Sequence, residues 1–162
     1  ILKKARAEAA QIVADGNATA EEKASQIEQR GESAQELDRR KRILGAKQGI
    51  ITSILDEVLE KLVNLPDKEY FELILKLVAK YQTGESGEVA LDQKDIKRIP
   101  ADFSKKLNEI SSGKLVLSNQ TRKTYGGFVL IYGGIEENCS FKAMLESRDE
   151  QLRDRIRDML FG

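Results

Sequence analysis

The fold depends on the first 63 residues, which are ILKKARAEAAQIVADGNATAEEKASQIEQRGESAQELDRRKRILGAKQGIITSILDEVLEKLV (residues 1–63). This stretch contains no proline, and it is rich in Ala, Glu, Lys, Arg and Gln, which are good helix formers. We therefore predict one long helix, which at about 1.5 Å per residue would extend for roughly 90 Å. Because a small globular core cannot cover that length, we expect the helix to need a partner along much of it.

The small and apolar residues of the N-terminal half recur in steps of four, four and three. The set consists of Ile1, Ala5, Ala9, Ile12, Gly16, Ala20, Lys23, Ile27, Gly31 and Ala34, in which Lys23 is the one charged member, and it repeats every eleven residues. An eleven-residue repeat is typical of a straight or right-handed supercoil. Because these residues are small, two helix backbones can approach closely, but each residue buries little area. We expect pairing here to be weak unless it extends over a long stretch.

From Leu37 onward the spacing changes to the four-three steps of a heptad. One row contains Leu37, Leu44, Ile51 and Val58, and the other contains Lys41, Gln48, Leu55 and Leu62. We predict a partner-helix face that consists of Ile12, Ile27, Leu37, Leu44, Ile51, Leu55, Val58 and Leu62, and that binds most strongly near residues 50–62. The last few residues of this face could instead dock on the chain's own globular domain, if the chain reverses direction near Pro66.

Two features of this helix allow other interpretations. Gly16, Gly31, Gly45 and Gly49 each cost up to about 1 kcal/mol relative to Ala, so they mark small-residue contacts, bends or breaks. A partly frayed helix with an accidental periodicity is the simplest alternative. The basic run at residues 39–42 suggests nucleic-acid binding, but acidic residues lie directly before it. We interpret the run as a solvated face with pairing across one helical turn.

The composition limits the classes of function. The 162 residues include 27 basic and 27 acidic side chains, and this balance argues against a general nucleic-acid binder. No apolar run is long enough to span a bilayer, so we expect no direct membrane insertion. No signal peptide is visible, and the single cysteine, Cys139, fits a reducing cytoplasm. The sequence opens in mid-pattern without a methionine or a helix cap, so we expect further residues upstream of Ile1.

The sequence lacks most of the residues and motifs that common enzyme active sites and metal sites contain. Histidine is absent, and with only one cysteine the usual zinc sites are excluded. The sequence contains neither a phosphate-binding G-x-x-x-x-G-K-S/T loop nor a dinucleotide-binding G-x-G-x-x-G motif. We therefore expect no cofactor, no metal site and no catalysis by this chain.

The rest of the chain predicts a small globular domain over residues 64–162. Pro66 ends the long helix, and an apolar helix should follow up to Tyr81. We expect strands at residues 88–92, 114–117, 128–132 and 135–140, a helix at 102–110, and one terminal helix at 141–161, while a helical turn within 93–100 is left open. The last two strands form a hairpin around Gly133-Gly134. The fold class is α+β: a long N-terminal coiled-coil helix followed by a small mixed α/β globular domain with a short sheet packed by helices.

The hairpin and the terminal helix contain recognisable sequences, namely GGFVL at residues 126–130, the glycine turn, FKAMLE at 141–146 and LF at 160–161. Together with the long helix and the Leu65-Pro66 break, they resemble the E subunit of the V-type and A-type rotary ATPases. The resemblance covers the whole chain through the order of its elements. The family tends to have an Arg-Leu pair where this chain has Met144-Leu145, so the chain departs from the family at that position.

This resemblance implies a non-catalytic peripheral-stalk subunit, or stator, of a proton- or sodium-translocating ATPase or ATP synthase. Residues 1–63 would form a heterodimeric coiled coil with the small helical stalk subunit, called G or H in different lineages. Residues 64–162 would bind the catalytic head, chiefly its B subunit. The protein would be cytoplasmic and peripheral to the membrane, and it would hold the head against the torque of the rotor.

Two alternatives come from other classes of protein. Residues 125–131 partly match the RNP1 strand of an RNA-recognition motif, in which exposed aromatic residues stack on bases. The strand at 114–117 has no second aromatic residue, so we favour a buried hairpin strand with Phe128 in the core. The other alternative is a homodimeric coiled-coil scaffold. It would place Lys23 and Lys41 against their own copies, which favours a different partner chain.

Overall fold

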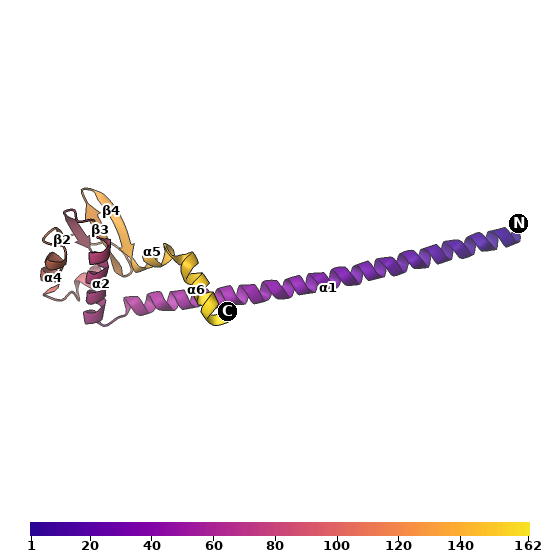
Figure 1. Ribbon diagram of the computed structural model, residues 1–162, viewed down its shortest axis with the longest axis horizontal. Coiled ribbons are helices and arrows are strands. Elements are labelled where there is room, and N and C mark those ends of the chain that lie inside the picture. Colours follow the sequence, from indigo (N-terminus) through magenta and orange to yellow (C-terminus); the bar gives the residue numbers. More distant parts are fainter. The chain divides into compact units, whose positions relative to one another are not determined.

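The structure, a computed structural model, describes residues 1–162 and begins with one uninterrupted helix, α1 (Leu2–Val63; Figure 1). The glycines inside α1 do not break it, and a Cβ atom added at Gly16, Gly31 or Gly45 would meet nothing within 4 Å. The predicted long helix is therefore confirmed. Within this chain, these three glycines mark neither a helix break nor a close side-chain contact.

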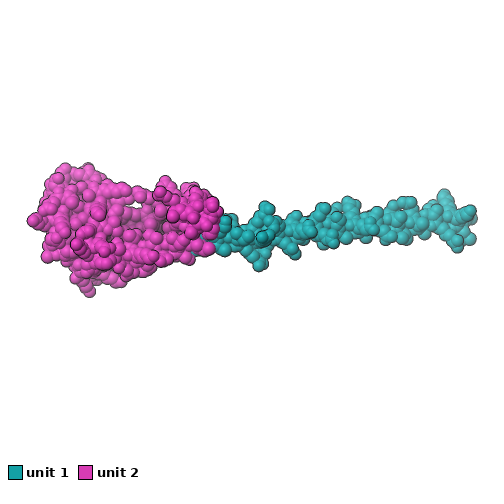
Figure 2. Space-filling view, turned by 60° about the horizontal axis from the view of Figure 1, so that its bottom comes forward, with its two compact units in different colours: residues 1–49 teal, residues 50–162 magenta.

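Contacts divide the chain into two compact units, residues 1–49 and residues 50–162, which are teal and magenta in Figure 2. The second unit begins inside α1, so the last turns of this helix belong to the globular unit. The division that we predicted from the sequence lies instead after residue 63, where the helix ends. The roles that we assigned to residues 1–63 and 64–162 stay predictions.

The globular unit contains a four-stranded sheet in the order β2-β1-β3-β4. The elements after α1 are α2 (Asp67–Tyr81), β1 (Gly87–Ala90), α3 (Gln93–Ile96), α4 (Phe103–Ile110), β2 (Leu115–Leu117), β3 (Gly127–Tyr132) and β4 (Ile135–Ser140). Strand β1 runs parallel to β2 and antiparallel to β3, and β3 pairs antiparallel with β4. Gly133 and Gly134 both have positive φ angles in the hairpin turn, as predicted. The α+β fold class is confirmed.

The C-terminal segment differs from its prediction, because two helices replace the single helix expected at residues 141–161. They are α5 (Phe141–Glu146) and α6 (Asp149–Phe161). The Ser147 hydroxyl donates to the Met144 carbonyl at 2.9 Å, and Arg148 has a non-helical φ of −126°. Asp149 and Glu150 then begin a new helix, where carboxylates are favourable at the positive end of the dipole. The helical turn left open within residues 93–100 is α3.

The core of the globular unit gathers side chains from α2, α4 and the sheet. Its largest fully buried side chains are Tyr70, Phe103, Phe128, Ile74, Leu91, Leu107, Leu115, Leu130, Val78 and Val89. Helix α2 contributes several of them because its apolar residues recur at helical spacing on a wide face. Phe128 is fully buried and cannot stack on a base, so the RNA-recognition interpretation is wrong and the buried hairpin strand is confirmed.

Candidate functional site

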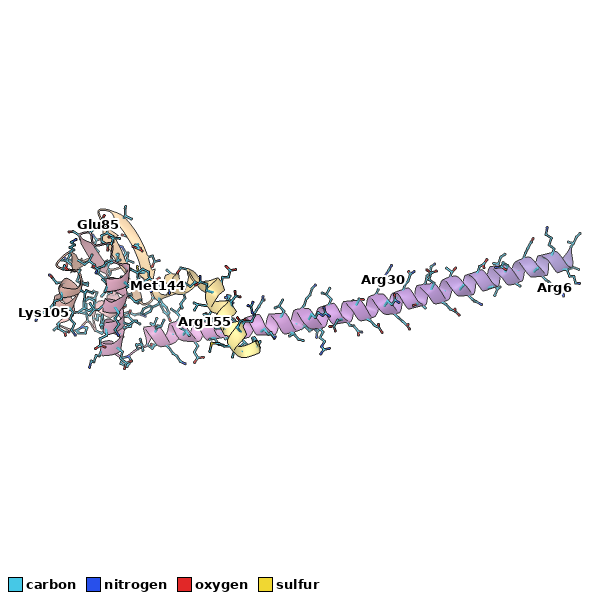
Figure 3. The ribbon with its side chains drawn as sticks, viewed as in Figure 1. Arg6, Arg30, Glu85, Lys105, Met144 and Arg155 are labelled. Carbon is cyan, nitrogen blue, oxygen red and sulfur yellow. The ribbon has the colours of Figure 1, made fainter.

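The first unit leaves its apolar side chains in solvent. Within residues 1–49 every residue is exposed except the half-buried Lys47, and side chains such as Arg6 and Arg30 project away from the helix (Figure 3). Four residues of the predicted partner-helix face lie here: Ile12, Ile27, Leu37 and Leu44 are 71%, 68%, 53% and 57% exposed. An extended row of exposed apolar residues is typical of an interaction surface. Their contact with a partner stays a prediction.

The basic run at residues 39–42 pairs with the acidic residues before it. Arg40 donates to Glu36 at 2.9 Å, and Arg42 lies 2.8 Å from the Asp38 carboxylate. Arg39 lies 4.0 Å from the other oxygen of Glu36. These pairs across one helical turn confirm the solvated face, and they lower the net positive charge that a nucleic acid would meet.

The last turns of α1 contain the other four residues of the predicted face, and their own chain covers most of them. Ile51 is only 6% exposed, Leu55 is half-buried, and Leu62 packs against the core, whereas Val58 is 38% exposed. The alternative left open by the sequence, docking on the chain's own domain, therefore describes Ile51, Leu55 and Leu62 in this chain. Whether a partner also touches this stretch stays a prediction.

Sequence reasoning missed Leu59, which also packs against the core. A signal for it exists, because residues 51, 55, 59 and 62 are spaced by the same four-four-three steps as the set in the N-terminal half, although in a different phase. Nearby, Arg153 of α6 donates to the Thr52 hydroxyl at 3.1 Å and to the Asp149 carboxylate at 2.7 Å. Helix α6 therefore has a polar attachment to the end of α1.

A buried hydrogen-bond network joins α2, α3 and β3. The Tyr70 hydroxyl donates to Asp95 Oδ2 at 2.7 Å and accepts from the Gly127 N–H at 3.0 Å. Arg98 donates to Asp95 Oδ1 at 2.9 Å and to Asp67 Oδ1 at 3.0 Å, and its guanidinium lies 4.1 Å from the centre of the Tyr70 ring. Desolvation, with the hydrogen bond to Asp95, raises the pKa of Tyr70. The charge of Asp95 is thus balanced inside the domain.

The single thiol is buried, and the acidic side chains form no cluster of the metal-binding kind. Burial raises the pKa of the Cys139 thiol to about 11, so the reactive thiolate is scarce at neutral pH. No three residues of the types His, Cys, Asp and Glu lie together so that they could hold a metal ion. No helix combines the length and apolar character that crossing a bilayer requires.

A long helix with an uncovered apolar row, followed along the chain by a small α+β domain, is typical of a protein that binds partners through its helix. Comparison with known proteins gives the family. Residues 1–161 match the family model described as ATP synthase (E/31 kDa) subunit, and the chain belongs to this family. The resemblance found in the sequence is confirmed.

The chain is similar to several bacterial proteins that are named as E subunits. It is 34% identical to the V-type ATP synthase E subunit of Clostridium botulinum (strain Langeland) over 124 residues, which are 74% of this chain and 62% of that protein. It is 36% identical to the V-type ATP synthase E subunit of Acetivibrio thermocellus over 106 residues, 62% of this chain and 54% of that protein. The V-type proton ATPase E subunit of Thermoanaerobacter pseudethanolicus is 29% identical over 126 residues, 75% of this chain and 63% of that protein. The chain spans about three fifths of the length of these curated relatives.

Proposed function

We propose that this chain is a non-catalytic peripheral-stalk protein, or stator, of a V-type or A-type ATPase or ATP synthase that translocates protons or sodium ions. The uncovered apolar row on residues 1–49 of α1 is the observation that carries the proposal. A stator needs a long paired helix and a firm anchor, but no active site. Membership of the E-subunit family supports this role, and it supports a cytoplasmic position, peripheral to the membrane.

The proposed partner of α1 is the small helical stalk subunit, G or H. Burial of one Leu or Ile side chain contributes about 1.5–3 kcal/mol, so the exposed residues at 12, 27, 37 and 44 could together hold two helices. Because Ile51 and Leu62 are already covered by their own chain, we place the pairing mainly on residues 1–49, with Val58 as its continuation. We propose that residues 64–162 bind the catalytic head, chiefly its B subunit.

A homodimeric coiled-coil scaffold is the second candidate, because an exposed apolar row could equally face a second copy of the same chain. A parallel, in-register homodimer would bring Lys23 and Lys41 close to their own copies. Both lysines are exposed in this chain, and their repulsion in such a pair favours a different partner.

The test is the mass of the purified chain in solution, alone and mixed with the helical stalk subunit from the same source. We expect a stable one-to-one complex and a rise in helical circular dichroism on mixing, because nearly all of residues 1–49 are exposed in the lone chain. A homodimer that does not bind the helical stalk protein would overturn the stator proposal in favour of the scaffold.

A further inference from the structure

A groove of about 610 Å³ opens in the globular unit beside the end of α1, α3 and the loop before β3. It is lined by Val63, Asp92, Gln93, Lys94, Asp95, Lys97, Thr121, Arg122, Lys123, Tyr125 and Gly126. These residues come from three segments of the chain. None of them belongs to the partner-helix face.

The lining of this groove has more basic than acidic side chains. Lys94, Lys97 and Lys123 line it, and their ammonium groups form no ion pair or hydrogen bond. Of the two acids in the lining, Asp95 is paired with Arg98 and accepts from Tyr70, whereas Asp92 Oδ1 only accepts the backbone N–H of Lys94 at 2.9 Å and keeps its negative charge. Arg122 is paired with a glutamate outside the groove, Glu136, at 2.6 Å. Three lysines whose ammonium groups have no ion pair therefore line the groove beside one unneutralised carboxylate.

An aromatic ring is fixed in the same wall. Tyr125 is 54% exposed, and its hydroxyl donates to Glu60 Oε1 at 2.8 Å. Its φ of 49° lies in the left-handed region, which is unfavourable for a residue with a Cβ atom. The next residue, Gly126, has a φ of 92°, and a Cβ atom there would lie 2.9 Å from Val63 Cγ2. The exposed ring of Tyr125 and the apolar side chain of Val63 therefore line the groove together with the lysines.

We propose that this groove is the docking site for an acidic peptide segment of the catalytic head, with an apolar side chain that packs against Val63 and Tyr125. This proposal rests on the stator function proposed above. Because the whole chain has no net charge, electrostatic attraction for a partner has to come from a local surface such as this one.

The position of the lysines favours a peptide over a small anion. Exposed ammonium groups keep their hydration, so each contributes little to the binding of one small ion. A peptide with several carboxylates adds these contributions along its length, and it supplies the apolar side chain that a free phosphate lacks.

The test reverses the charge of the groove in the full chain, paired with its helical stalk subunit. The variant combines Lys94→Glu, Lys97→Glu and Lys123→Glu. The matched control combines Lys68→Glu, Lys76→Glu and Lys105→Glu, which change the same net charge at exposed positions on α2 and α4 (Lys105 is labelled in Figure 3). The readout is the affinity for the isolated catalytic head, and near-UV circular dichroism verifies that both variants are folded.

We expect the groove variant to bind the head at least about tenfold more weakly, while the control stays within about twofold of the unmodified chain. Equal affinities for both variants would overturn the groove proposal and leave the stator function standing. A stalk pair that shows no affinity for the head, even without substitutions, would overturn the stator function itself. Displacement of the head by inorganic phosphate at constant ionic strength would show a small-anion site and would also overturn the proposal.

A second readout identifies the occupant. A carbodiimide joins a lysine amine directly to a carboxylate that lies against it, without a spacer. We expect amide links from Lys94, Lys97 and Lys123 to one acidic segment of the catalytic head, located by mass spectrometry of the digested complex. Links from these lysines to the helical stalk protein instead would contradict the proposed partner.

Discussion

Residues 1–49 and residues 50–63 belong to the same helix, yet only the second stretch is covered by its own chain. The first stretch has Ile or Leu at wide intervals between Ala, Gly and charged residues, and its apolar side chains are exposed. The second has Ile51, Leu55, Leu59, Leu62 and Val63, which are buried or half-buried. A regular helix therefore says nothing by itself about what stabilises it, since one end of α1 has tertiary packing and the other end has none.

Several side-chain hydrogen bonds and ion pairs inside residues 1–49 join residues one helical turn apart. Hydrogen bonds from Gln11 to Asp15 and from Gln26 to Glu22, and ion pairs such as Arg42–Asp38, each span one turn. Such pairs contribute about 0.2–0.5 kcal/mol each in an isolated helix. Because most helical stability in proteins comes from packing of an apolar face, this stretch should depend on a partner far more than residues 50–63 do.

The largest expected effect concerns the uncovered stretch. Replacing Leu37→Ala and Leu44→Ala together should weaken binding of the helical stalk subunit by about 3–6 kcal/mol, since each buried Leu contributes about 1.5–3 kcal/mol. Isothermal titration calorimetry measures the loss. Val13→Ala is the control, because Val13 is exposed but lies outside the predicted face. A similar loss with the control would mean that the predicted face is wrong.

The second prediction compares substitutions in residues 1–49 and 50–63 by their effect on the unfolding of the chain without a partner. Ile51→Ala should lower the free energy of unfolding of the globular unit by about 2–4 kcal/mol, because a buried Ile leaves a cavity. Ile12→Ala should change it by less than about 0.5 kcal/mol, as is usual for an exposed residue. Urea unfolding followed by near-UV circular dichroism reports the globular unit through its tyrosines. Equal losses of stability from Ile51→Ala and Ile12→Ala would show that residues 1–49 and 50–63 do not differ in tertiary packing.

A smaller effect is expected for the network beside the end of α1, where Arg98 also reaches the Val63 carbonyl at 3.5 Å. Tyr70→Phe leaves Asp95 Oδ2 and the Gly127 N–H without their partner, which should cost about 1–3 kcal/mol of unfolding free energy. Urea unfolding of the two proteins at neutral pH measures it. An unchanged stability would show that the network contributes little.

The same pair of proteins should respond differently to alkaline pH. The folded state raises the pKa of Tyr70 above its ordinary value of 10.0, so above that pH the unfolded chain loses a proton that the folded chain keeps. The contribution of this hydroxyl to stability is complete below pH 10.0 and declines as the pH rises further. The stability difference between the unmodified chain and Tyr70→Phe should therefore narrow above pH 10.0 and stay constant between neutral pH and that value.

The smallest effect tests the small-residue row. Gly31→Ala should stabilise the helix of the lone chain by about 0.5–1 kcal/mol, because nothing within 4 Å opposes the added Cβ atom. If the backbones of two paired helices approach closely at this row, the same change should weaken pairing with the helical stalk protein. Circular dichroism of the lone chain and calorimetry of the pair measure the two effects. Stronger pairing in the variant would argue against a close approach at Gly31.

Much of the fold follows from local sequence signals. The long helix, the Pro66 break and the glycine hairpin depend on propensities and turn residues within a few positions, and the structure confirms them. The break at Ser147 escaped prediction because the apolar spacing of residues 141–161 continues across it. At this break the Ser147 hydroxyl donates to the carbonyl three residues earlier, and a local hydrogen bond of this kind leaves no trace in hydrophobic periodicity.

The sequence by itself determined a long helix with an uncovered apolar row, a small α+β domain, and the family. These features repeat along the chain or depend on neighbouring residues, so the order of amino acids contains them. Only the tertiary structure decided which residues at the end of α1 are covered. It also decided that Tyr70 forms hydrogen bonds with residues 25 and 57 positions away, and that Lys94, Lys97 and Lys123 line one groove. The reason is that such contacts depend on chain reversals and packing, which bring distant residues together without any local pattern.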